Sequence, residues 1–139
     1  MSIADTVAAF QALHATIPGV TSAPTALPSA INEVELPLVI TKPDEAFWNE
    51  QAVGLKRQGR TYLIYCLVAP VASGESVTDS GFQASLPLLQ AFGEAYLCNR
   101  SLGGAVDHLN NIRDGGAEVL TFSRVDYHGF TYRVDAVEK

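Results

Sequence analysis

The N-terminal segment spaces its apolar positions with the period of an amphipathic helix. The apolar stripe consists of Ile3, Val7, Phe10, Leu13 and Ile17. Ser2 can cap this helix together with Asp5, and the Pro18-Gly19 pair stops it, so the pattern predicts a helix over residues 2–16. His14 lies off the apolar stripe and is expected to be a solvated helix residue.

Between residues 20 and 50 the pattern becomes irregular. Proline, serine, threonine and alanine over residues 20–35 indicate an extended arm followed by a loop. The run "LPLVIT" is typical of a short buried strand, which Pro37 places at a sheet edge or at a strand start. Residues 42–50 are expected to form a polar loop. Its aromatic pair, Phe47 and Trp48, either folds back onto the core or serves as a contact surface.

The middle of the chain reads as a hairpin followed by a helix. Two strand-like runs over residues 51–70 flank the turn "RQGR", and the second run is apolar on both faces, as in a central strand. After a loop, a helix begins near Thr78 or Asp79, with "SLPLLQAFGEAYL" as its firm part and a kink or late start at Pro87. Its predicted buried face consists of Phe82, Leu86, Leu89, Phe92 or Gly93, and Tyr96.

The C-terminal third holds three strand-like runs, residues 105–114, 117–127 and 129–139, divided by "GG" and "HG". Their closeness favours an antiparallel meander. The order helix, strands, helix, strands predicts an α+β fold, with a mainly antiparallel β-sheet and two helices packed on one face. Residues 1–139 are expected to form a single domain.

Composition narrows the class of protein. A chain of 139 residues with 47% hydrophobic and 17% charged residues can bury a stable core without disulfides or structural metal ions. Its apolar runs are too short to span a bilayer, and its N-terminus lacks the pattern of a signal peptide, so the cytosol is the expected compartment. The formal net charge of −6 argues against a surface that grips nucleic acid. Cys66 and Cys98 lie in apolar surroundings and are expected to be buried free thiols.

The stretch "NRSLGGAVDHLNNIRDGG", residues 99–116, raises the question of a phosphate-binding loop or a metal site. It lacks the spacing and the lysine of a phosphate-binding loop, and no helix opens after its glycines, as a dinucleotide site would require. No serine sits in a glycine-bracketed elbow, and neither cysteine lies in a basic, electropositive setting. Turn chemistry accounts for the glycines: Gly103 and Gly104 are expected to turn the helix into a strand, and Gly115 and Gly116 to form a hairpin turn.

A metal or acid–base site remains as an alternative. Its candidates are Asp107, His108, Asp114, Asp126 and His128. On a strand, Asp107 and His108 would point to opposite faces, and no histidine spacing matches a zinc pattern. Solvated strand and turn residues are the better explanation, so we expect no catalytic residue, no metal ligand and no cofactor.

Several segments together resemble a known family. They are the "LPLVIT" strand, the "W…G…R…Y.I.…V" hairpin, a long helix ending in "L.NRSLGGAVDH", the "IRDGG" turn and the final "V.Y.G..YRV" strand. In this order they are similar to tail terminator proteins, also called tail completion proteins, of long-tailed bacteriophages. The resemblance covers nearly the whole chain, and "LGG.VD" is its most specific motif.

The resemblance implies a structural protein, not an enzyme, that forms a homo-hexameric ring. Such a ring binds the last ring of the tail tube protein, stops its polymerisation and offers a joining surface to the head–tail connector protein. It would be assembled in the host cytoplasm and reside at the head-proximal end of the virion tail. DNA would pass through its lumen without specific binding, which an acidic lumen favours. The resemblance implies no contact with a membrane.

A ring needs a heterologous interface, in which one surface of each subunit meets a different surface of the next. The expected ring contacts join a basic group to an acidic group across subunits, because opposite charges set register. The basic group is Lys56, Arg57 and Arg60, and the acidic group is Asp44, Glu45 and Glu50. Two other functions stay open: a head–tail connector or neck ring component, and a small metal-dependent hydrolase or ligand-binding domain.

Overall fold

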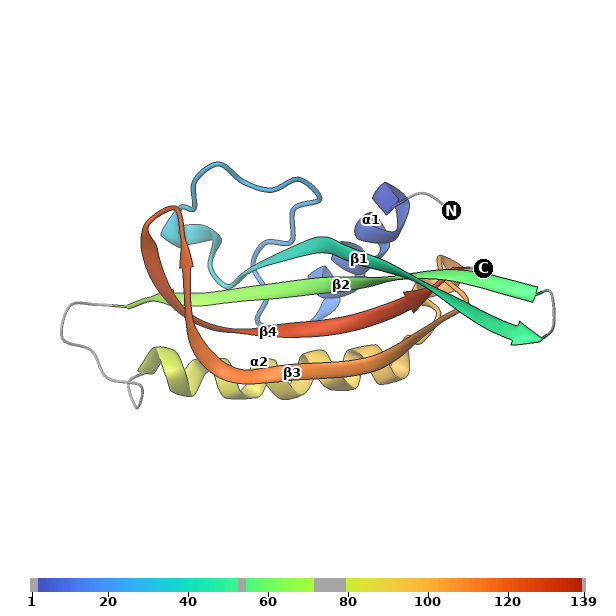
Figure 1. The fold of residues 1–139 in the computed structure, drawn as a ribbon. Helices are drawn as coiled ribbons and strands as arrows, with labels where there is room; N and C mark the ends of the chain where they lie inside the picture. Colours follow the sequence, from blue (N-terminus) through green and yellow to red (C-terminus); the bar gives the residue numbers. More distant parts are fainter. Residues whose placement is uncertain (1–2, 53–54, 72–79, 139) are drawn as a thin grey trace.

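The computed structural model describes residues 3–52, 55–71 and 80–138, which form two α-helices, two short 3₁₀ turns and four strands (Figure 1). In chain order the elements are α1 (Ile3–Thr16), η1 (Glu33–Glu35), β1 (Leu38–Ala52), β2 (Leu55–Pro70), α2 (Ser80–Cys98), η2 (Leu102–Gly104), β3 (His108–Phe122) and β4 (Val125–Val137). The fold is α+β, as the sequence predicts. No helix of the described residues is long and apolar enough to cross a membrane.

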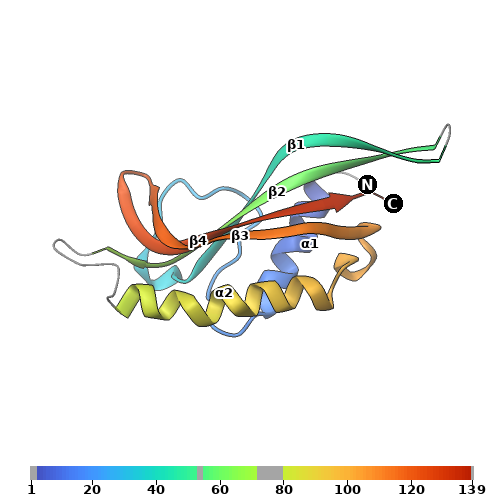
Figure 2. The same cartoon turned by 60° about the horizontal axis from the view of Figure 1, so that its bottom comes forward.

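The four strands form one antiparallel sheet with the order β1-β2-β4-β3. β1 is an edge strand that starts directly after Pro37, which agrees with both predictions for that proline. β2 pairs with β4 only from Gly59 to Pro70. The far half of the β1–β2 hairpin therefore continues past the end of β4 as a two-stranded arm (Figure 2).

Both helices pack on the same face of the sheet, where they share one core (Figure 2). Alternation along β2 directs Tyr62, Ile64, Cys66 and Val68 towards the helices. The helices also touch each other through aromatic rings, because Phe10 of α1 meets Tyr96 of α2 edge-on at 6.3 Å between centroids. The two helices thus form a single layer over the sheet.

Two of the predicted loops are strands. Residues 42–50 continue β1, and "RQGR" lies inside β2 instead of forming a turn. β1 is an edge strand, and antiparallel sheets carry polar residues on a solvated face, so polar residues do not exclude strand structure there. Bulges between Pro43 and Ala46 and between Glu50 and Ala52 absorb the irregular pattern.

The C-terminal third holds two long strands instead of the three predicted. Gly115 and Gly116 lie inside β3, at a bulge between Asp114 and Ala117, so the hairpin turn predicted there is wrong. The chain reverses at Ser123 and Arg124, which both have positive φ (49° and 66°). The "HG" pair is part of β4. Two consecutive residues with positive φ are typical of the tight turns that match strand twist.

The second helix runs from Ser80 through Pro87 to Cys98, so the late start expected at the proline is wrong. Its buried face is also shifted from the prediction. Phe92 and Tyr96 are fully buried as expected, but Leu86 is 40% exposed and Ser85 is buried in its place. The Ser85 hydroxyl donates to the Gly81 carbonyl at 2.9 Å, which allows a polar side chain on the inner face.

The segment between α2 and β3 turns with left-handed backbone, as the glycines predict. Leu102, Gly103 and Gly104 all have positive φ, and Gly104 has the largest, +94°. The Leu109 amide donates to the Arg100 carbonyl at 2.6 Å, which closes the turn. The helix therefore passes into β3 through a conformation that favours glycine.

Replacing Gly104 by valine should lower the free energy of unfolding by at least about 1–2 kcal/mol, because a β-branched side chain opposes positive φ. Urea denaturation of the wild type and Gly104→Val measures the change. An unchanged midpoint would mean that the backbone at this position does not need glycine.

Candidate functional site

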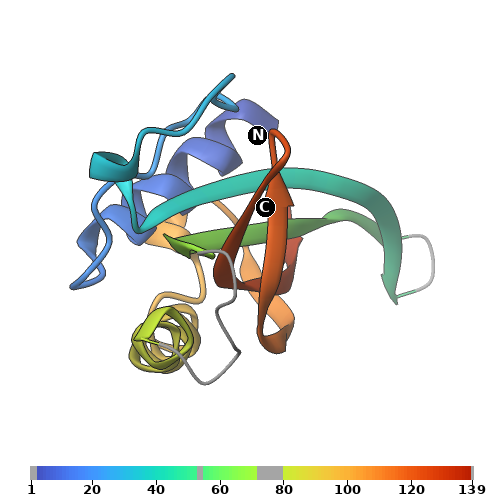
Figure 3. The same ribbon diagram turned by 90° about the vertical axis from the view of Figure 1, so that its left-hand side faces the viewer.

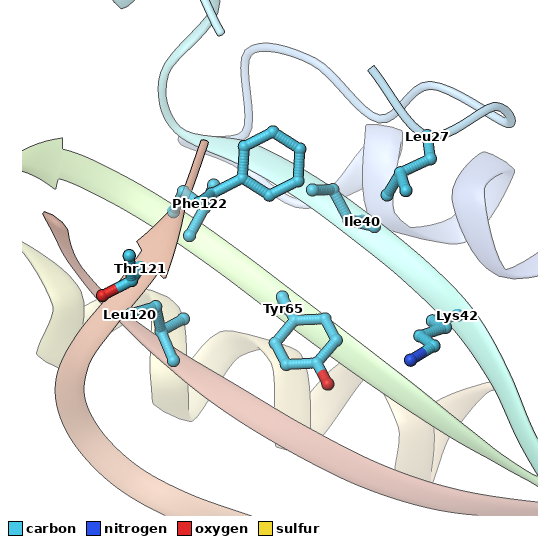
Figure 4. A pocket seen from close by; sticks show the side chains of 8 residues that line it. Leu27, Ile40, Lys42, Tyr65, Leu120, Thr121 and Phe122 are labelled. Atoms are coloured by element: carbon cyan, nitrogen blue, oxygen red, sulfur yellow. The ribbon is translucent and has the colours of Figure 1, made fainter. Parts of the chain in front are cut away.

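The face of the sheet opposite the helices carries a pocket of about 320 Å³ (Figure 4). It is lined by Leu27, Ile40, Lys42, Tyr65, Leu67, Leu120, Thr121 and Phe122. Most of these residues belong to a second apolar cluster, which also includes Leu38 and Tyr127. This face therefore has an apolar hollow although it lies outside the main core.

Four parts of the chain build the pocket: the segment before β1, β1, β2 and the end of β3. Alternation along the strands places Ile40 and Lys42 of β1 with Tyr65 of β2 on the open face. The end of the β3–β4 hairpin bends out of the plane of the sheet and brings Leu120 and Phe122 over it (Figures 1 and 3). The segment before β1 closes the other side. The Ser123 hydroxyl ties the hairpin end to it by donating to the Ser29 carbonyl at 3.3 Å.

Two polar groups lie at one end of this apolar pocket. The Lys42 ammonium and the Tyr65 hydroxyl lie at the same side of the hollow, while Phe122, Ile40 and Leu27 surround its other side (Figure 4). Within the described residues, neither polar group has a hydrogen bond or an ion pair. An apolar hollow with a few convergent polar groups is the usual form of a binding site.

Charged residues continue along the same face. The register places Lys42, Leu63, Arg133 and Arg113 in one row across the four strands. Arg133 pairs with Asp44 at 3.3 Å, and both side chains are substantially exposed, so this pair contributes little stability. Carboxylates flank the row on both sides, and this part of the face is mixed in charge, not basic.

The residues predicted for ring contacts lie together in one hairpin of one chain. In the backbone register Glu50 faces Lys56. Arg60 donates to the Asp44 carbonyl oxygen at 2.7 Å. Glu45 lies at the bulge in β1 and is exposed. The side chains of Glu50, Lys56 and Arg57 lie outside the described part of the structure, and contacts between subunits stay a prediction.

Only one residue of the aromatic pair, Phe47, has a side chain within the described part of the structure. Phe47 lies opposite Gly59 in the register, and its ring occupies the space that a Cβ of Gly59 would need. Phe47 is half-buried there and covers the glycine of the neighbouring strand, as aromatic residues do in sheets. The side chain of Trp48 lies outside the described residues, so its role as a contact residue stays a prediction.

The acid–base candidates do not form one site. Asp107 precedes β3, so it does not point away from His108 as expected, and its carboxylate contacts the His108 ring at 2.7 Å. His108 lies opposite Val137, whereas His128 lies opposite Val119 near the other end of the same ladder. The structure therefore separates the two histidines.

The remaining acidic candidates lie in strands, Asp114 at the bulge of β3 and Asp126 at the start of β4. The Asp114 carboxylate accepts from the Gly116 amide at 2.9 Å, and Asp126 accepts from the Thr121 hydroxyl at 2.6 Å. Among the residues that the structure describes, no group of three or more His, Cys, Asp and Glu could hold a metal ion.

His14, expected to be solvated, is instead fully buried in a polar network. Its Nδ1 lies 2.7 Å from the Gln11 side-chain oxygen, and its Nε2 lies 2.7 Å from the Tyr96 hydroxyl. Gln11 also accepts from Thr41 at 2.7 Å and donates to the Val39 carbonyl at 2.9 Å. Burial lowers the pKa of His14 to about 3. This network links α1, α2 and β1.

The sequence of α1 contains one indication of this polar network, which the stripe of apolar residues does not include. Gln11 and His14 are three residues apart and therefore neighbours on the helix surface. They share the buried side with Phe10, while Ile3, at the start of the predicted stripe, is 41% exposed. A local pattern predicts that such polar residues are solvated, because their buried partners come from other elements of the fold.

The two cysteines differ in environment, and both are free. Cys66 is buried, as predicted, and burial raises the pKa of its thiol to about 12. Cys98, predicted to be buried, is exposed at the end of α2.

The open-face pocket is thus the candidate binding site of the described residues. Its apolar walls come from four parts of the chain, and its two donors lie together at one end. No model of a known protein family matches this sequence, and no curated protein matches it.

Proposed function

We propose that this chain is a tail terminator protein of long-tailed bacteriophages. In this role, copies of the chain form a ring that caps the tail tube, stops its polymerisation and joins the tail to the head. A head–tail connector or neck ring component is the nearest alternative, since it would also act as a ring.

The observation that carries the proposal is the order of motifs along nearly the whole chain, ending in "NRSLGGAVDH" and "V.Y.G..YRV". The fold is compatible with this role. The turn "SLGG" connects α2 to the edge strand β3, and the arm of β1 and β2 extends from the opposite edge of the sheet (Figure 2). The β1 edge beyond its bridge to Ser22 and the β3 edge are two different surfaces, as suits the head-to-tail contacts from which rings are built.

Deleting the gene for this chain from the phage that encodes it is expected to give overlong tails, because nothing then ends polymerisation of the tube. Electron microscopy of the particles measures tail length and attachment to filled heads. The wild-type gene, supplied in trans, is the control and should restore normal particles.

The same images separate the alternatives. Tails of normal length that fail to join heads would favour the connector or neck component. Tails of normal length that are joined to filled heads would contradict both assignments.

A further inference from the structure

The open-face pocket sets clear requirements for an occupant. Its interior accepts an apolar group, and its end presents the Lys42 ammonium and the Tyr65 hydroxyl, which both donate hydrogen bonds (Figure 4). An occupant must therefore carry an acceptor, and preferably a negative charge, next to a compact apolar group. The volume of about 320 Å³ has room for one branched side chain and its neighbours.

The same chain exposes a group of this kind in η1. Val34 is 77% exposed and stands between Glu33 and Glu35. Asn32 holds the turn in place. Its side chain accepts from the Val34 amide at 3.3 Å, and its carbonyl accepts from the Glu35 amide at 2.9 Å. Val34 is thus presented to solvent on an ordered turn with a carboxylate on each side.

We propose that η1 of one copy docks on the pocket of a second copy. Val34 enters the apolar hollow, and the carboxylate of Glu33 or Glu35 meets Lys42 and Tyr65. Each copy carries both the turn and the pocket, so every copy offers two surfaces to its neighbours. This contact is an interface between subunits of the proposed ring. The placement of that ring in a phage tail rests on the proposed function.

The net charge of the chain favours docking of the acidic η1 turn at Lys42 over nonspecific contacts between copies. With a net charge of −6, copies of the chain repel one another at most orientations. An attractive contact between copies needs a cation that is not already neutralised by its own chain. Lys42 meets that condition within the described residues, whereas Arg133 is paired with Asp44.

Sedimentation velocity over a range of protein concentrations tests the proposal. The wild type should self-associate, and more weakly as salt is raised, because a charge pair contributes. Val34→Asp and Lys42→Glu should each raise the dissociation constant about tenfold or more, since one places a carboxylate in an apolar hollow and the other opposes two carboxylates. Both positions are exposed, so neither variant should disturb the fold.

A charge exchange makes the test specific. The double variant Glu33→Lys with Glu35→Lys should associate as weakly as Lys42→Glu. Combining all three substitutions in one chain should restore association, because the charges are again opposite. Leu97→Asp is the matched control: this leucine is 61% exposed on α2, outside the proposed contact, and its replacement should change nothing.

Three results would overturn the proposal: a wild type that stays monomeric up to about 1 mM, association that Lys42→Glu leaves unchanged, or failure of the triple variant to recover. The phage experiment separates this inference from the proposed function. If the pocket variants leave association unchanged while the gene deletion gives overlong tails, the contact is rejected and the proposed function stands. Pocket-dependent association with normal tails would reject the function alone.

Discussion

Gly129→Ala is expected to prevent the chain from folding. A Cβ at this position would overlap the backbone carbonyl oxygen of Cys66 on the neighbouring strand β2. That oxygen cannot move aside like the end of a flexible side chain, because Cys66 lies in a central strand and is fully buried. To admit the methyl group, β2 and β4 must separate where they hold the core together. We expect a loss of more than about 4 kcal/mol, most of the stability of an ordinary small domain.

Gly115→Ala is the matched control for this substitution. Gly115 also lies in a strand, but its Cβ would have ordinary contact with Glu118 at 3.8 Å and its φ is not positive. Circular dichroism and urea denaturation of the two variants should show an unfolded or aggregated Gly129→Ala and a Gly115→Ala close to the wild type. A folded Gly129→Ala with wild-type stability would show that the two strands do not approach as closely as described.

Acid should destabilise the chain through His14. Burial holds its pKa at about 3, against 6.5 for an ordinary histidine. Between these two values the unfolded chain binds a proton that the folded chain does not. The part of the unfolding free energy that depends on neutral His14 is therefore fully present above pH 6.5. It is lost as the pH falls from 6.5 towards 3, at about 1.4 kcal/mol for each pH unit. A fall of about two units should cost about 2–3 kcal/mol.

The hydrogen bonds explain why the folded chain keeps this ring neutral. The Gln11 amide nitrogen donates to two carbonyls, of Pro24 and Val39, which fixes its oxygen as the acceptor for His14 Nδ1. A neutral ring with its proton on Nδ1 then accepts at Nε2 from the Tyr96 hydroxyl. A second proton on the ring would turn that accepting nitrogen into a donor and place a charge in the core.

Urea denaturation at several pH values measures this effect. His14→Gln should be less stable than the wild type near neutral pH, and the difference between the two should shrink as the pH falls. His108→Gln, at a partly exposed histidine, should follow the wild-type curve. Parallel curves for the wild type and His14→Gln would contradict the assignment.

Local sequence signals were sufficient for the end of α1 and for the turn after α2. α1 ends at Thr16, as predicted, because the Pro18-Gly19 stop is a local signal, whereas Ser2, the predicted cap, lies outside the described residues. The glycine turn after α2 was likewise predictable, since positive φ at Gly104 is a property of a few consecutive residues. The α+β class follows from the order of these elements.

The pattern failed where a neighbouring element changes what a residue touches. The polar stretch from Lys42 to Glu50 looks like a loop, yet it is a strand because β2 supplies its hydrogen bonds. Gly115 and Gly116 look like a turn, yet pairing with β4 continues on both sides of them and leaves only a bulge. Strand pairing is decided by partners that are distant in sequence.

The candidate site shows the same division. The sequence by itself determined that a small domain with two helices and an antiparallel sheet would form, because caps, periodicity and turn glycines act over a few residues. Only the tertiary structure decided that His14 is buried, that His108 and His128 lie apart, and that Lys42 and Tyr65 stand at the end of one apolar pocket. Burial and convergence depend on which distant segments pack together, and in this chain a bend of the β3–β4 hairpin brings Phe122 over a face that no helix covers.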